Sequence, residues 1–307
     1  MASPDALEKL RGLEAHLRAN LLGQDHVLAR VASVLVRGEM GLKPAGRPRG
    51  SFLFVGPTGS GKTELALCFT EFLLGPDCLH RFDMSEYQLQ SSVDRLLGSG
   101  LDDCGMLGRV LQGGRRGTLL FDEMEKAHPL VLDVFLQILD GARVTVATGE
   151  TLSVSEHYVV FTSNLGSVEA MRMEQLGRAG IERAVLRRVE QHLRPELTAR
   201  IEEKLVFGRL TPEVQREICA LLVARETARL RKLGHDLVVT REVMEFLLRE
   251  GFDPQLGARP LRGAIERHLQ GAVVKSLLVH GFARGRVVVD SQGASAVAID
   301  SGPHARR

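Results

Sequence analysis

The sequence lacks several residue types and patterns, and each absence argues against a class of protein. It has no Trp and only two Tyr among 307 residues, which argues against recognition of nucleic-acid bases by aromatic stacking. Forty Lys and Arg nearly balance 38 Asp and Glu, and the charges are interspersed. No dedicated polyanion-binding surface, and hence no nucleic-acid partner, is therefore expected. No run of 18 or more apolar residues occurs, so no membrane-spanning helix and no membrane partner are predicted.

The cysteines are few and widely separated. Cys68, Cys78, Cys104 and Cys219 form no CxxC or CxxH spacing, so they predict reduced, mostly buried thiols rather than a metal or redox site. The first 20 residues carry a charge every few positions and contain no apolar segment typical of an export signal. We therefore expect a cytoplasmic protein. Its length and 44% hydrophobic residues are typical of two globular domains.

Short apolar runs alternate with longer helical patterns through the first two-thirds of the chain. Strands separated by helices predict an α/β fold, in which a parallel sheet is covered by helices on both faces. The strand-like runs are 51–55, 79–83, 118–122, 158–163 and a shorter one at 204–207, and the helical stretches include 26–38, 62–73 and 130–140.

The pattern changes after Phe207. Amphipathic helices are predicted at 212–233, 241–250 and 259–280, with short strands at 236–240, 285–290 and 295–299, the last pair turning at 291–293. We therefore expect a large domain over residues 1–208. A smaller, mainly helical domain with a short β-sheet should follow over residues 209–307.

The most specific motif stands between the first predicted strand and the helix at 62–73. It fits G-x-x-x-x-G-K-[ST] and consists of Gly56, Pro57, Thr58, Gly59, Ser60, Gly61, Lys62 and Thr63. The glycines let backbone N–H groups close around a phosphate chain at the positive end of the following helix. Lys62 is placed for the β and γ phosphates and the Thr63 hydroxyl for Mg²⁺. The motif predicts a site for ATP with Mg²⁺, in the fold of a P-loop NTPase.

A pair of acids complements this motif. Asp122 and Glu123 end the predicted strand at 118–122, and ligands collect at that edge of parallel sheets. Asp122 suits the Mg²⁺ shell, and Glu123 suits activation of an attacking water. Taken alone, the two carboxylates could equally cap the start of a helix. Beside the phosphate loop they favour hydrolysis over phosphoryl transfer to a small molecule.

Six sequence blocks carry a more specific resemblance. They are GPTGSGKTELA (56–66), RFDMSEY (81–87), LLFDEMEKAHP (119–129), FTSNLGS (161–167), LRPELTARIE (193–202) and GFDPQLGARPLRGAIE (251–266). In these blocks and their order the sequence resembles the Clp/ClpB family of AAA+ chaperone ATPases, specifically its second nucleotide-binding domain, over roughly residues 20 to 290. The resemblance implies an AAA+ fold and an ATPase.

The resemblance also implies roles for single residues. Asn164 matches the sensor that orients water against the γ-phosphate, and Arg259 matches a second sensor in the smaller domain. Arg200 matches the finger that enters a neighbouring subunit's site. Arg194 is its rival, since the family has an Arg there too, and the family's Asn before the finger is Ala199 here. Leu22, in Leu-Leu-Gly-Gln (21–24), matches the segment that packs on adenine.

The family resemblance implies a homo-oligomer, a hexameric ring, that acts on a protein client or through an adaptor. Two departures qualify this. Family unfoldases thread polypeptide with a Gly-Tyr-Val-Gly loop. The loop at 98–105 is shorter, and no Phe, Tyr or Trp occurs from Gln88 to Leu120, so that Leu101 and Met106 are the only nearby substitutes. No peptidase-docking tripeptide (Ile/Leu-Gly-Phe/Leu) stands between Ser167 and Leu193.

The near-neutral charge argues against a third function, that of a nucleic-acid-remodelling AAA+ protein, and two functions remain open. The first is an ATP-dependent ring that remodels or disassembles proteins or protein complexes. The alternative is an ATP-gated interaction or assembly module that acts through a dedicated partner without threading a polypeptide.

Overall fold

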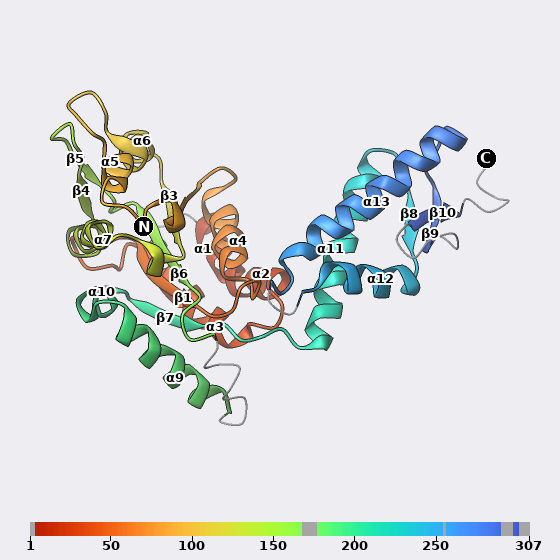
Figure 1. Cartoon of the computed structure of the whole chain (residues 1–307), viewed down its shortest axis with the longest axis horizontal. Coiled ribbons are helices and arrows are strands. Elements are labelled where there is room, and N and C mark those ends of the chain that lie inside the picture. Colours follow the sequence, from red (N-terminus) through yellow and green to blue (C-terminus); the bar gives the residue numbers. More distant parts are fainter. Residues whose placement is uncertain (1–3, 168–176, 254–255, 290–296, 301–307) are drawn as a thin grey trace. The chain divides into compact units, whose positions relative to one another are not determined.

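The computed structural model describes residues 4–167, 177–253, 256–289 and 297–300 (Figure 1). The chain forms two compact units, of which the first consists of residues 1–57 and 61–209 and the second of residues 58–60 and 210–307. Within the described residues no helix is long and apolar enough to cross a membrane.

A five-stranded parallel sheet forms the centre of the first unit, as the alternating pattern predicts. Its strand order is β2-β3-β6-β1-β7. The strands are β1 (Gly50–Val55), β2 (Leu79–Asp83), β3 (Gly117–Asp122), β6 (His157–Ser163) and β7 (Glu203–Val206). Every residue of β1, β3 and β6 is buried, which is typical of a parallel sheet covered on both faces.

Helices cover both faces of this sheet. Alternate residues of β1 separate between the two layers: Phe52 and Phe54 join one hydrophobic cluster, and Leu53 and Val55 join the other. The first layer is formed by α2 (Leu13–Asn20), α3 (Asp25–Glu39) and α4 (Lys62–Leu74), with α1 (Pro4–Arg11) contacting α2. The second layer contains α5 (Ser92–Leu97), α6 (Gly105–Gln112), α7 (Pro129–Gly141), α9 (Gly177–His192) and α10 (Pro195–Arg200).

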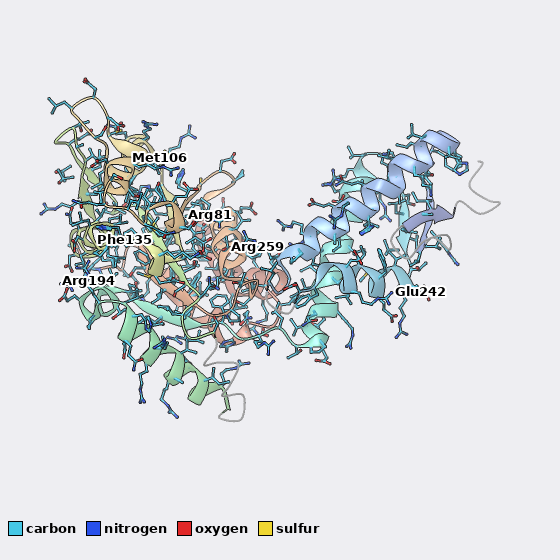
Figure 2. All side chains as sticks on the ribbon, viewed as in Figure 1. Arg81, Met106, Phe135, Arg194, Glu242 and Arg259 are labelled. Carbon is cyan, nitrogen blue, oxygen red and sulfur yellow. The ribbon has the colours of Figure 1, made fainter. Side chains whose placement is uncertain are left out.

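The second layer has an aromatic centre. Phe135 of α7 lies 4.6 Å from Phe121 of β3 and 5.0 Å from Phe161 of β6, measured between ring centroids (Figure 2). Aromatic pairs in this distance range stabilise a core beyond the area that they bury. The contact fixes the direction of α7 relative to the sheet, and so fixes where both ends of α7 lie.

A small hairpin follows α7 in the stretch 141–156, for which the sequence pattern predicted no strands. It pairs β4 (Arg143–Thr145) with β5 (Thr151–Ser153) in antiparallel register. Its strands are too short to give a readable alternation. The hairpin is tied to the end of α5, where the N–H of Ala147 donates to the carbonyl of Leu97 at 2.9 Å.

The second unit is smaller and mainly helical. Its helices are α11 (Pro212–Lys232), α12 (Arg241–Gly251) and α13 (Arg259–His280). A three-stranded sheet in the order β10-β9-β8 completes it, formed by β8 (Leu237–Val239), β9 (Gly285–Val289) and β10 (Val297–Asp300). Phe246, Leu269 and Val287 join helices and sheet in one core. The predicted turn at 291–293 lies outside the described residues.

The four cysteines form no disulfide, and they are less buried than expected. Only Cys219 is buried, where burial raises the pKa of its thiol to about 11. Cys68, Cys78 and Cys104 are half-buried. Cys68, in α4, packs against the hydrophobic cluster of the first layer, and Cys78 lies between α4 and β2.

A histidine in the core makes the stability of the first unit dependent on pH. His157, at the start of β6, is 3% exposed, and burial together with the nearby His80 lowers its pKa from an ordinary value of 6.5 to about 4. His157 therefore becomes protonated below about pH 6.5 in the unfolded chain but only below about pH 4 in the folded chain. Stability should fall through this window as pH decreases, by about 3 kcal/mol in total.

Comparison of the native chain with His157→Leu tests this expectation. The free energy of unfolding of the variant should depend less on pH between about 6.5 and 4. Substitution of the exposed His192 by Leu serves as the control and should leave the native dependence in place. Parallel pH profiles for the native chain and His157→Leu would contradict the expectation.

Candidate nucleotide-binding site

The strand order brings three predicted motifs together at one edge of the sheet. The phosphate loop follows β1, Asp122 ends β3, and Asn164 follows β6. Because β6 lies between β1 and β3, the carboxyl ends of these strands are neighbours. Ligands bind at this edge in open parallel sheets.

Glycine makes the tight course of the phosphate loop possible. Gly56, Gly59 and Gly61 have φ angles of 151°, 71° and 102°, which L side chains rarely adopt. A Cβ at Gly56 would lie 2.6 Å from the carbonyl oxygen of Phe207, so even a methyl group has no room there. Helix α4 begins directly after the loop, at Lys62, and its free N–H groups give that end a partial positive charge. The loop and helix end are therefore suited to bind phosphate.

Lys62 is the most deeply buried cation of this edge. It is 7% exposed, and its Nζ donates to the carbonyl oxygens of Gly56 at 2.6 Å and Pro57 at 2.9 Å and to Oδ1 of Asn164 at 2.9 Å. Burial lowers the pKa of Lys62 to about 8, although the nearby acids favour the charged form. The ammonium is therefore charged at neutral pH and held by neutral acceptors. Charged phosphate oxygens are stronger acceptors and can replace them.

Asp122 is fixed by two neighbours that the motif alone did not indicate. Its Oδ2 accepts from Arg81 of β2 at 2.5 Å, and its Oδ1 accepts from the hydroxyl of Thr162 (Figure 2). The Thr162 hydroxyl in turn accepts from the N–H of Glu123 at 3.0 Å. Arg81 and Thr162 lie in the RFDMSEY and FTSNLGS blocks, so the block resemblance was the only signal that marked them.

Glu123 is held in a strained backbone conformation. Its φ and ψ are 57° and 49°, a left-handed geometry that is unfavourable by roughly 1–2 kcal/mol for a side-chain-bearing residue. Its Oε1 accepts from the amide of Asn164 at 3.0 Å, and its Oε2 pairs with Lys126 at 2.5 Å. The hydrogen bond from Lys126 to Glu123 raises the pKa of Lys126. Asn164 therefore bridges Lys62 and Glu123, the two residues on which phosphate binding and hydrolysis would depend.

Glu125 is a further acid that sequence reasoning missed. Its Oε1 accepts from the backbone N–H of Asn164 at 3.0 Å, and so orients the residue that bridges Lys62 and Glu123. Its Oε2 is buried and has no hydrogen-bond partner within the described part of the chain. The glutamate stands two residues after Glu123, in a position that a motif search for one acid pair does not examine.

The residues present fit Mg²⁺. The cation prefers oxygen ligands, and it binds to proteins through one or two carboxylates together with substrate phosphates. Asp122 offers a carboxylate that already accepts from a cation, Arg81, and Thr63 offers a hydroxyl at the start of α4. Among the described residues no group of three or more His, Cys, Asp or Glu side chains could hold a metal.

The segment expected to contact adenine lies beside the phosphate loop. Leu21 is 5% exposed, and its side chain lies 2.8 Å from the position that a Cβ of Gly61 would take. Gln24 is buried and exchanges two hydrogen bonds with the backbone of Gly208, each 3.0 Å long. Leu22, the residue predicted for adenine, is half-buried. The packing contact with the loop is thus made by its neighbour Leu21.

Three further predicted residues are arginines. Arg259 is the first residue of α13, in the second unit. Arg194 pairs with Asp133 at 2.8 Å near the start of α7, whereas Arg200 pairs with Asp140 near its end. The two candidate fingers therefore stand at opposite ends of one helix. Neither Arg194 nor Arg200 belongs to the network of Lys62, Asn164 and Glu123.

The fold and this edge define a P-loop ATPase domain, and comparison with known proteins gives the family. A family model described as "AAA domain (Cdc48 subfamily)" matches residues 47–204. A second model, "C-terminal, D2-small domain, of ClpB protein", matches residues 210–289. The chain belongs to the AAA family, and within it to the Clp/ClpB type that the sequence blocks indicated.

Individual relatives agree. The chain is 36% identical over 294 residues to Chaperone protein ClpB 1 of Thermosynechococcus vestitus, covering 93% of this chain and 34% of the relative. It is 38% identical over 279 residues to Heat shock protein 100 of Trypanosoma brucei brucei, covering 88% of this chain and 32% of that relative. A solved S. cerevisiae Hsp104–ADP complex superposes with a TM-score of 0.85 at 32% identity, covering 97% of this chain and 54% of that one. The chain thus spans about a third of the length of these curated relatives.

The low pKa of Lys62 predicts how nucleotide affinity depends on pH. Phosphate binding needs the ammonium, which loses its proton as pH rises through about 8. The affinity of a fluorescent ATP analogue should therefore fall above pH 8, approaching about tenfold per pH unit. Lys62→Arg keeps its charge, so whatever affinity it retains should change little over the same range. A native affinity that stays constant from pH 7 to pH 9.5 would refute this expectation.

Proposed function

We propose that the chain hydrolyses ATP as part of a ring that remodels or disassembles proteins. The observation that carries the proposal is the network in which Asn164 joins the phosphate-binding Lys62 to the acid Glu123. Membership of the Clp/ClpB type supports the coupling of hydrolysis to remodelling. A relative solved as "Hsp104:ATPyS and FITC casein" supports a protein client, at 31% identity and a TM-score of 0.82.

Each residue of the site has a proposed task. The loop 56–61 and Lys62 bind the phosphates, and Thr63 and Asp122 hold Mg²⁺, which when bound would neutralise phosphate charge. Glu123 accepts a proton from the attacking water after its ion pair with Lys126 has broken, and Asn164 orients that water. Leu22 lies beside the base. Arg259, from the smaller domain, senses the phosphates as the resemblance implies.

The position of Arg200 supports action on a neighbouring subunit. Arg200 ends α10 just before β7, so it lies at the amino-terminal edge of a sheet whose nucleotide site is at the carboxyl-terminal edge. A strand of five or six residues separates these edges by about 17–20 Å. An arginine there cannot reach its own subunit's γ-phosphate. We therefore propose a homo-oligomeric, hexameric ring in which Arg200 acts in trans.

The proposal extends to domain roles and compartment. Residues 1–208 would be the large nucleotide-binding domain and residues 209–307 the small domain, supported by the division between Arg209 and Leu210. Cysteines that form no disulfide are typical of a reducing compartment, which supports a cytoplasmic location.

Complementation between variants tests the trans mechanism. ATPase activity per subunit should rise with protein concentration as rings form. Arg200→Ala should lose about 10³-fold in kcat, and Glu123→Gln should be inactive although it binds nucleotide. Mixing the two should restore activity, because the Glu123→Gln subunit supplies Arg200 to an intact neighbouring site.

The rival finger provides the control. If Arg200 is the finger, mixing Arg194→Ala with Glu123→Gln should not produce the gain in ATPase activity expected for Arg200→Ala. Concentration-independent activity, or complementation by Arg194→Ala in place of Arg200→Ala, would overturn the assignment.

One observation favours the alternative of a gated module without threading, namely the structure of the loop at 98–105. Gly100 and Asp103 form an isolated bridge, and the Asp103 carboxylate accepts from the N–H groups of Ser99 at 3.3 Å and Gly105 at 3.0 Å. Leu101 is left at the tip and is 82% exposed. The loop is a closed turn that presents one leucine, where threading relatives would present an aromatic.

Substitution of Leu101 separates the two functions. If the loop grips a client, Leu101→Ala should weaken an unfolded model protein's stimulation of the ATPase, with about tenfold lower apparent affinity. Leu101→Tyr should strengthen it. Leu89, also exposed at 70%, lies outside the loop, and Leu89→Ala is the matched control. Undiminished stimulation of Leu101→Ala would favour the module that acts without threading.

A further inference from the structure

Two arginines share one carboxylate at the end of α7. Asp140 accepts from Nε of Arg200 and pairs with Nη1 of Arg47 at 3.5 Å. Arg200 is also tied to its own helix, where Nη1 donates to the carbonyl oxygen of Glu196 at 2.6 Å. The proposed finger is therefore folded back onto its own subunit, with Asp140 as its anchor.

Arg47 has an attachment that does not depend on Arg200. Its Nη1 donates to the carbonyl oxygen of Leu139 at 2.7 Å, one of the last carbonyls of α7. The end of a helix carries partial negative charge from such carbonyls, and a cation there is favourable. Arg47 can therefore remain beside Asp140 when Arg200 departs.

The position of Asp140 makes a counter-ion necessary. A carboxylate near the C-terminus of a helix adds negative charge where the helix dipole is already negative. If Arg200 extends toward a neighbouring subunit, Asp140 loses one of its two cations. With Arg47 in place, the Asp140 carboxylate keeps a counter-ion after Arg200 has left. Without Arg47 the carboxylate would have no counter-ion, and the departure of Arg200 would be less favourable.

The surroundings allow such a movement. Arg47 and Arg200 line the same cavity of about 220 Å³, together with Arg37, Lys43, Arg49 and Glu202. The side chains of Asp140, Arg200 and Arg47 are 44%, 34% and 40% exposed, so water reaches all three. An ion pair of this exposure shifts an equilibrium by about fivefold or less. That is enough to bias the finger and too little to lock it.

We propose that Asp140 restrains Arg200 within its own subunit and that Arg47 is a positioning residue, which neutralises Asp140 and so lets the finger extend. The inference rests on the proposed trans role of Arg200. In this scheme Arg47 touches no substrate, and acts by setting the population of extended fingers in the assembled ring.

The test is a mutant cycle measured at ring-saturating protein concentration. Arg47→Ala should lower kcat by about three- to fivefold with little change in KM for ATP, because the finger is held back more strongly. Asp140→Asn should raise kcat by up to about fivefold, because the restraint is removed. The double variant should match Asp140→Asn, since Arg47 has no carboxylate left to neutralise.

Two further variants serve as controls. Arg37→Ala removes another cation of the cavity, one that pairs with Glu202 at 2.6 Å, and should leave kcat unchanged. Arg47→Lys keeps the charge and should retain most of the activity.

The outcomes separate the inference from the function on which it rests. If Arg200→Ala keeps full activity, the finger assignment itself is wrong. If Arg200→Ala is inactive, two results would overturn the inference. Either Arg47→Ala has a normal kcat, or the double variant keeps the lowered kcat of Arg47→Ala. In both cases Arg47 does not act through Asp140. A defect that arose only from misfolding would not be rescued by Asp140→Asn, and would count against the inference in the same way.

Discussion

The hydrogen bonds of the buried Lys62 ammonium are the interaction on which the site depends. A buried charge is tolerated only where it is fully hydrogen-bonded, and here two carbonyls of the loop and Asn164 provide the acceptors. The loop must curve back to offer those carbonyls, which requires its glycines. Asn164 must stand at the end of β6, which requires β6 beside β1. The conformation of the loop, the order of the strands and the position of Asn164 are thus linked through one cation.

The sheet separates two chemical tasks by placing them at opposite edges. The carboxyl ends of β1, β3 and β6 hold the phosphate loop, the acid pair and Asn164, and Thr162 connects β6 to Asp122 and Glu123 across the strands. The amino-terminal edge holds Arg200, beside the end of α7. A rigid sheet cannot fold one edge onto the other. Under the proposed mechanism each subunit therefore contains half of two sites, and assembly is a requirement of the chemistry.

The sequence predicted the sheet well because each central strand is a continuous apolar run next to a turn signal. The five strands and the helices α4, α7 and α13 lie close to their expected positions for that reason. Lys62, Asp122, Glu123 and Asn164 were identifiable because the motifs are local or the blocks resemble a family. Arg81, Glu125 and Lys126 lie in the same blocks, but the sequence assigned them no role, since their roles follow from contacts across strands and turns. The sequence did not predict the hairpin of β4 and β5, because three-residue strands show no periodicity.

The closed turn at 98–105 bears on how a client could be held. A turn braced by Asp103 is already ordered, so contact with a client orders little additional backbone. A leucine nevertheless buries less area than an aromatic ring, so one loop grips weakly. Several such loops in a ring would act on one chain at high effective concentration, and their combined affinity would exceed that of any one. A leucine-tipped loop is thus compatible with threading only if several subunits engage the client together. A single engaged loop would suit a partner that presents a dedicated pocket.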